Sequence, residues 1–149
     1  MSSGVTSVSA SGGERTVNWG RFALVGLATV IAAVVANVLV FYIGSAFVSY
    51  DPQFLPLMGA GPAVMFTVVP AIVAVLLYAA LLRFVRNPER VFVIISIVVF
   101  IVTLIPDFIY IPDVPGATVG QTTILILMHV VAAIVIVLML TRLTRTRSA

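Results

Sequence analysis

The sequence contains neither cysteine nor lysine in its 149 residues. Without cysteine the chain can form no disulfide, no thiolate metal site and no thiol–disulfide exchange, which excludes a thiol oxidase. Without lysine it cannot form a Schiff base with a carbonyl substrate. All of its basic charge is therefore carried by eight arginines.

Charged residues of any kind are scarce. They make up 9% of the chain against 62% hydrophobic residues, and the mean hydropathy is +1.25. Soluble domains carry roughly 25% charged residues. Because so few polar side chains cannot cover this many apolar ones in water, we expect lipid to be the solvent of this chain.

What the sequence does have is long apolar runs. A helix needs about 20 apolar residues to cross a bilayer. Four stretches meet this length, at about 22–43, 61–82, 91–111 and 122–141. We predict an all-α membrane protein whose residues 21–142 form a four-transmembrane-helix up-down bundle. Residues 1–20 are predicted to be a disordered cytoplasmic tail and residues 143–149 a basic cytoplasmic tail.

The arginines predict the orientation of this bundle. Arg15 and Arg21 precede the first span, Arg83, Arg86 and Arg90 lie between the second and third, and Arg142, Arg145 and Arg147 follow the fourth. All eight therefore fall on one side, whereas the connections on the other side carry only Asp51 and Asp113. The positive-inside rule then puts both termini in the cytoplasm, and we expect a multi-pass protein of a bacterial plasma membrane. Three arginines directly after a span are typical of contacts with anionic lipid, so we expect no nucleic-acid partner.

Small residues recur at helical spacing on three of the spans. The first span has two such stripes. One consists of Ala28, Ala32 and Ala36, and the other, directly beside it, consists of Thr29, Ala33 and Asn37. Small residues at this spacing allow membrane helices to approach closely. The third span is instead rich in valine, isoleucine and phenylalanine, so we expect it to face more lipid.

Four polar residues, one on each span, are predicted to lie at a similar depth. At about 1.5 Å per residue, Asp107 lies about 25 Å beyond Arg90, near the outer edge of a hydrocarbon layer about 30 Å thick. Asn37, Thr67 and His129 fall within roughly 10 Å of the same level by the same count. Polar residues inside a span usually face the bundle interior and bind one another. These four are our candidates for a ligand-binding or proton-relay cluster.

Simpler interpretations of the same residues remain open. Asp107 would end the third span at the level of the lipid headgroups. His129 would be a neutral imidazole bonded to Asn37, Thr67 or a backbone carbonyl, and Asn37 would only hold two helices together.

Three classes of function are compatible with this pattern. The first is a non-enzymatic membrane protein that binds a small ligand or a membrane partner subunit, and the second is a proton-coupled transporter or channel that acts as a homo-oligomer. The third, a membrane enzyme or redox protein, has the least support, because one histidine cannot ligate haem twice and two ionisable residues are too few for a metal site. We therefore expect no cofactor.

Four segments resemble an uncharacterised family of small bacterial membrane proteins with four spans, one of the domain-of-unknown-function families. They are AAVVANVLV in the first span, GPAVMFTVVPAIVAVLLYAALLRF in the second, LIPD at the end of the third and LMHVVAAIVIV in the fourth. The resemblance covers about residues 20–145. It implies a four-helix inner-membrane protein without an assigned activity, and it supplies no catalytic residue.

Overall fold

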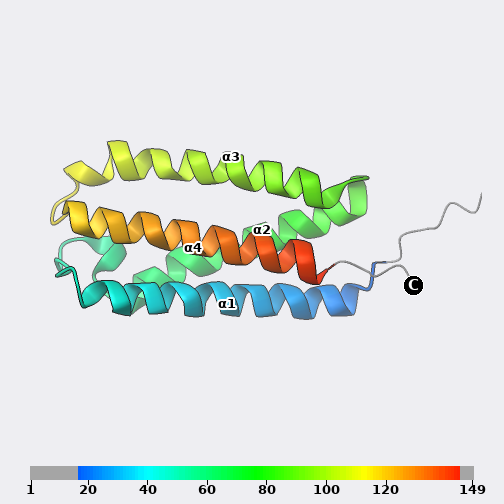
Figure 1. Ribbon diagram of the computed structural model, residues 1–149, viewed down its shortest axis with the longest axis horizontal. Coiled ribbons are helices and arrows are strands. Elements are labelled where there is room, and N and C mark those ends of the chain that lie inside the picture. The colour runs from blue at the N-terminus through cyan, green and yellow to red at the C-terminus, as the bar shows by residue number, and fades with distance from the viewer. Residues whose placement is uncertain (1–16, 145–149) are drawn as a thin grey trace, which may run out of the picture.

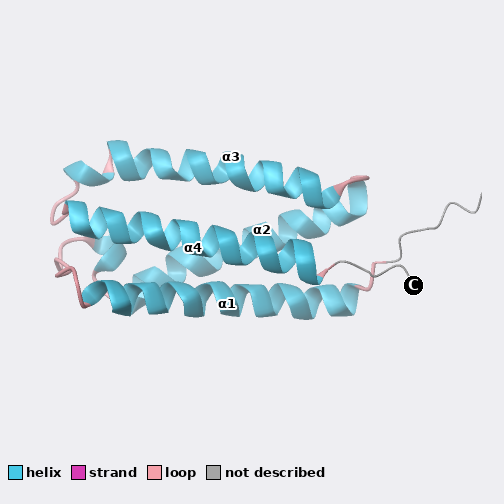
Figure 2. Cartoon of the chain, viewed as in Figure 1, coloured by secondary structure: helices cyan, strands magenta, loops and turns pink. Residues whose placement is uncertain are grey.

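Four long helices make up the computed structural model, which describes residues 17–144 (Figure 1). They are α1 (Trp19–Ser45), α2 (Ala60–Phe84), α3 (Pro88–Ile109) and α4 (Val119–Leu143). Two single 3₁₀ turns, Leu55–Leu57 and Ile111–Asp113, lie in the connections, and no strand occurs in this part of the chain (Figure 2). All four helices are long and apolar enough to cross a membrane, so the predicted fold class is confirmed.

The helix boundaries follow capping groups as well as the apolar runs. Asn18 Oδ1 accepts a hydrogen bond from the backbone N–H of Arg21 at 2.9 Å, so α1 begins at Trp19 rather than near residue 22. Thr118 Oγ1 caps α4 in the same way through the N–H of Gln121. The predicted tails lie outside the described residues, except for residues 17–20, of which 19 and 20 belong to α1, and residues 143 and 144, of which 143 belongs to α4.

The helices run alternately up and down, and the described chain begins and ends at the same end of the bundle (Figure 1). A hydrogen bond of 3.3 Å from Arg21 Nη2 to the carbonyl of Leu143 joins the first and last helices there. The connection between α2 and α3 lies at this end too, with Arg86 in it, Arg83 at the end of α2 and Arg90 at the start of α3. Helix α1 packs mainly against α4 and α2, whereas α2 and α3 touch each other much less.

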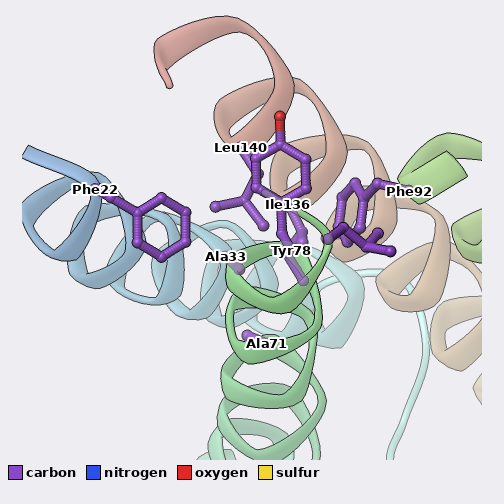
Figure 3. Close-up of a cluster of buried hydrophobic side chains, with 8 residues drawn as sticks. Phe22, Ala33, Ala71, Tyr78, Phe92, Ile136 and Leu140 are labelled. Atoms are coloured by element: carbon purple, nitrogen blue, oxygen red, sulfur yellow. The ribbon is translucent and has the colours of Figure 1, made fainter. Parts of the chain in front are cut away.

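An aromatic cluster closes the arginine end of the bundle. Tyr78 of α2 is 1% exposed, and its ring centroid lies 4.8 Å from that of Phe92 on α3 and 6.3 Å from that of Phe22 on α1. Leu140 of α4 completes the cluster, so all four helices meet here (Figure 3). Dense packing of this kind is the main attraction between helices in lipid, where the hydrophobic effect between them is weak.

The connection between α1 and α2 folds over the opposite end. Phe54 and Leu57 are almost fully buried against apolar side chains of α1, α2 and α4. Gln121 holds this cover to the connection between α3 and α4. Its side chain accepts from the N–H of Asp51 at 2.9 Å and donates to the carbonyl of Gly116 at 2.6 Å. This end is called the covered end below.

Burial in the structure shows which of the two stripes of small residues on α1 packs against the other helices. Thr29, Ala33 and Asn37 are buried, while Ala28 is exposed. The expected exposure of α3 is also found, since only Pro88, Phe92 and Asp107 of that helix are buried. In a membrane protein such an apolar exposed face is the surface that contacts lipid.

Candidate functional site

Asn37 and Thr67 join α1 to α2 by a buried hydrogen bond. Asn37 Nδ2 donates to Thr67 Oγ1 at 2.8 Å, and the two residues are 5% and 4% exposed. The hydroxyl of Thr67 in turn lies 2.8 Å from the carbonyl of Ala63, one helical turn back. The sequence predicted that these two residues are at the same depth, and the structure brings them into direct contact.

This short chain of hydrogen bonds fixes the orientation of the Asn37 amide. A carbonyl oxygen only accepts, so the hydroxyl proton of Thr67 is donated to Ala63, and Thr67 Oγ1 can only accept from Asn37. The Asn37 amide must therefore direct its nitrogen at Thr67. Its oxygen, Oδ1, is left buried without a hydrogen-bond partner. An unpaired buried acceptor of this kind costs about 1–3 kcal/mol.

Asp107 and His129 form the second pair, between α3 and α4. His129 Nδ1 lies 3.6 Å from Asp107 Oδ2, which is an ion-pair distance when the imidazole is protonated but too long for a hydrogen bond. Asp107 is 4% exposed and lies in the last turn of α3, which ends at Ile109. Its Oδ2 atom is buried without a hydrogen-bond partner.

The nearest partner of His129 is a backbone carbonyl, as one of the simpler interpretations proposed. Nδ1 lies 2.9 Å from the carbonyl oxygen of Leu125. Because that oxygen only accepts, Nδ1 must carry the hydrogen, and in the neutral ring Nε2 is then an acceptor. His129 is thus held by its own helix and faces α3 with a half-buried ring.

A cavity of about 200 Å³ connects the two pairs. Asn37, Thr67 and His129 line it, while Asp107 reaches it only through His129. The remaining walls are mainly apolar and come from α2, α3, α4 and Pro56 of the connection between α1 and α2. Phe66 of α2 and Val99 of α3 line the cavity and are 60% and 52% exposed, so its rim lies on the lipid-facing surface between these two helices.

Two features of this region were not predicted. Ser96 and Thr103 of α3 line the cavity, although neither is among the candidate residues from the sequence. Gln121, which is fully buried and ties the connections of the covered end together, was not identified as a structural residue. The pattern Thr118-x-x-Gln121 before an apolar run is the capping-box signature that could have indicated it.

The chemistry available at the site is limited. Within residues 17–144 there is no group of three or more His, Asp or Glu residues placed to hold a metal ion. The site offers hydrogen-bond acceptors, one ionisable pair and apolar walls. This combination is typical of a binding pocket in which a few polar groups orient a mainly apolar molecule.

Comparison with known proteins gives one match. The family described as "Family of unknown function (DUF6069)" matches residues 17–146, which include all four helices. This confirms the expected resemblance to a family without an assigned activity. Comparisons with curated proteins and with solved structures gave no match.

Proposed function

The chain belongs to the family of unknown function DUF6069, and we propose that it is a membrane protein that binds a small apolar or amphipathic molecule. The binding site is the cavity lined by Asn37, Thr67 and His129. The observation that carries the proposal is the buried Asn37 Oδ1, which has no hydrogen-bond partner and belongs to a residue on the cavity wall. A bound molecule would supply the missing partner.

Access to the cavity is from the lipid. Exposed lining residues lie on both α2 and α3, which make little contact with each other along the bundle. The covered end is closed by Phe54 and Leu57, and the arginine end by the cluster around Tyr78. A molecule dissolved in the bilayer therefore has the shortest path to the site.

Binding fits the site better than conduction does. A proton-coupled transporter needs a polar path from Asp107 and His129 to the arginine end. Tyr78, Phe92 and Leu140 fill the centre of the bundle on that path (Figure 3). Transport would require an oligomer in which the path runs between chains, and the close approach of Asp107 to His129 is the observation that keeps it as the alternative.

The proposal involves no reaction. The chain has no cysteine or lysine nucleophile, and Asp107 and His129 are the ionisable side chains beside the cavity. We further propose that the protein lies in a bacterial plasma membrane with both termini in the cytoplasm. The support for this orientation is the set of five described arginines at one end of the bundle, which the positive-inside rule assigns to the cytoplasm.

Native mass spectrometry of the protein released from its membrane in mild detergent tests the binding proposal. We expect a bound small molecule on the wild-type protein and its loss from Ala132→Phe, because Ala132 lines the cavity and a phenyl ring would fill it. Ala28→Phe is the matched control, since Ala28 is exposed on α1 away from the cavity. A wild-type spectrum without ligand, or equal occupancy in both variants, would contradict the proposal.

A further inference from the structure

We propose that the molecule bound in this cavity carries an uncharged hydrogen-bond-donating head, a hydroxyl group, on an apolar tail. This inference rests on the proposed function and goes further, because it names the chemical class of the ligand. It follows from which donors and acceptors the cavity leaves free.

Two residues of the cavity wall, Asn37 and His129, carry a free acceptor. Asn37 Oδ1 is buried without a partner, and its orientation is fixed by the donation of Asn37 Nδ2 to Thr67. His129 uses Nδ1 for the carbonyl of Leu125, which makes Nε2 of the neutral ring a second acceptor. A ligand head that donates a hydrogen bond therefore satisfies a group that the protein leaves unpaired.

Most donors on the wall are already used. Thr67 donates its hydroxyl proton to the carbonyl of Ala63, and Thr103 donates to the carbonyl of Phe100 at 2.9 Å. One N–H of Asn37 Nδ2 is bound to Thr67, which leaves its second N–H and the hydroxyl of Ser96 as the remaining donors on the wall. An ether, an ester or another head that only accepts would leave the buried Asn37 Oδ1 unsatisfied, whereas a hydroxyl head can satisfy it.

The charges around the cavity disfavour an anionic head. The carboxyl group of Asp107 lies beside His129, 3.6 Å from its ring nitrogen. The described arginines are at the other end of the bundle. Arg83 follows Thr67 by 16 residues, or about 24 Å along α2. A fatty acid would thus bring a second carboxylate near Asp107 without an arginine to pair with it, and like charges at close range repel.

The size and walls of the cavity favour a tail that extends into lipid. A volume of about 200 Å³ is below the roughly 300–1,000 Å³ of pockets that enclose a drug-sized ligand. The head and the first part of a chain fit inside, and the rest lies along the exposed faces of α2 and α3. The occupant is therefore a long-chain alcohol or a neutral lipid with a free hydroxyl.

Photolabelling in liposomes tests this class. Three probes share one alkyl chain with a diazirine and differ in the head: a primary alcohol, its methyl ether and the carboxylic acid. We expect the alcohol to label residues of the cavity wall, such as Phe100 and Val99, about three- to tenfold more than the ether, the range given by one net hydrogen bond. The acid should label no more than the ether.

Variants then assign the preference to Asn37. Asn37→Leu removes the free acceptor at similar size, and we expect the alcohol and the ether to label this variant equally. Thr29→Val is the matched control, because Thr29 is buried on the same face of α1, bonds only to the carbonyl of Val25 and does not line the cavity. It should keep the wild-type ratio. The wild-type ratio remains decisive if a variant does not fold.

The outcomes separate this inference from the proposed function. Equal labelling of the wild-type cavity by the alcohol and the ether would overturn the hydroxyl preference and leave the binding proposal intact, since both probes would then occupy the cavity. Labelling by the acid that matches the alcohol would overturn the exclusion of anions. If no probe labels the cavity wall, both the inference and the binding proposal fail.

Discussion

His129 Nδ1 lies 3.6 Å from Asp107 Oδ2, and the two residues connect α4 to α3, the long helix with the fewest buried residues. Both side chains were predicted to lie at one depth. Their proximity leads to the first of four predictions.

Asp107→Asn and His129→Ala should each lower the melting temperature in detergent, because each removes one member of the pair. The double variant should cost less than the sum of the two single ones, by about 0.5–2 kcal/mol, which is the range for neighbouring residues and for polar pairs in membrane proteins. Asp107→Asn combined with Thr29→Val is the control pair and should be additive, because Thr29 bonds only within α1. Strict additivity in the first cycle would show that the pair contributes nothing.

Gly44→Ala should destabilise the contact of α1 with α4 and the covered end. A Cβ atom at residue 44 would lie 2.5 Å from the hydroxyl of Tyr50 and 2.9 Å from Cδ1 of Ile124. Overpacking of this kind costs roughly 1–3 kcal/mol. Gly61→Ala is the control, since nothing lies within 4 Å of the corresponding position. Thermal unfolding of both variants in detergent checks the prediction, and equal melting temperatures would contradict it.

Stability should fall at high pH through Tyr50, which lies outside the spans. Burial raises the pKa of the Tyr50 phenol above its ordinary value of about 10, and the phenol also donates to the carbonyl of Phe41 at 2.8 Å. The folded state thus favours the neutral phenol. Its contribution is complete below about pH 10 and is lost as the pH rises through the raised pKa.

Tyr50→Phe separates this effect from the titration of the other tyrosines. It should be less stable than the wild type near neutral pH by about 0.5–1.5 kcal/mol, because one hydrogen bond is absent. Between about pH 9 and pH 11 its melting temperature should fall less steeply than that of the wild type. Parallel curves over this range would show that Tyr50 is not responsible.

The absence of cysteine makes the orientation testable with single introduced thiols. In intact cells, a membrane-impermeant maleimide should label Pro115→Cys at the covered end and should not label Asn87→Cys at the arginine end. Both positions are exposed in loops, so permeabilised cells should give label at both and serve as the control. Labelling of residue 87 from outside would reverse the proposed topology.

Much of this fold could be predicted from the sequence, because the bilayer imposes strong constraints. The length of the apolar runs around residues 22–43 and 122–141 requires helices that satisfy their own backbone groups. Because the helices alternate in direction, the positions of the arginines along the sequence place all the described ones at one end of the bundle. The depth of Asn37, Thr67, Asp107 and His129 followed from residue counts along straight helices.

Only the tertiary structure decided which of these groups touch. Rotation of a helix about its axis and its distance from the next helix depend on side-chain packing, and a span of valine, isoleucine and alanine has many faces of similar composition. From the sequence it was therefore not possible to predict which of the Ala28 and Thr29 stripes of α1 is buried. Nor was it possible to predict that Asn37 bonds to Thr67 and that its Oδ1 atom has no hydrogen-bond partner. The membrane fixes depth along each helix, while contacts across the bundle, and with them the candidate site, arise from packing.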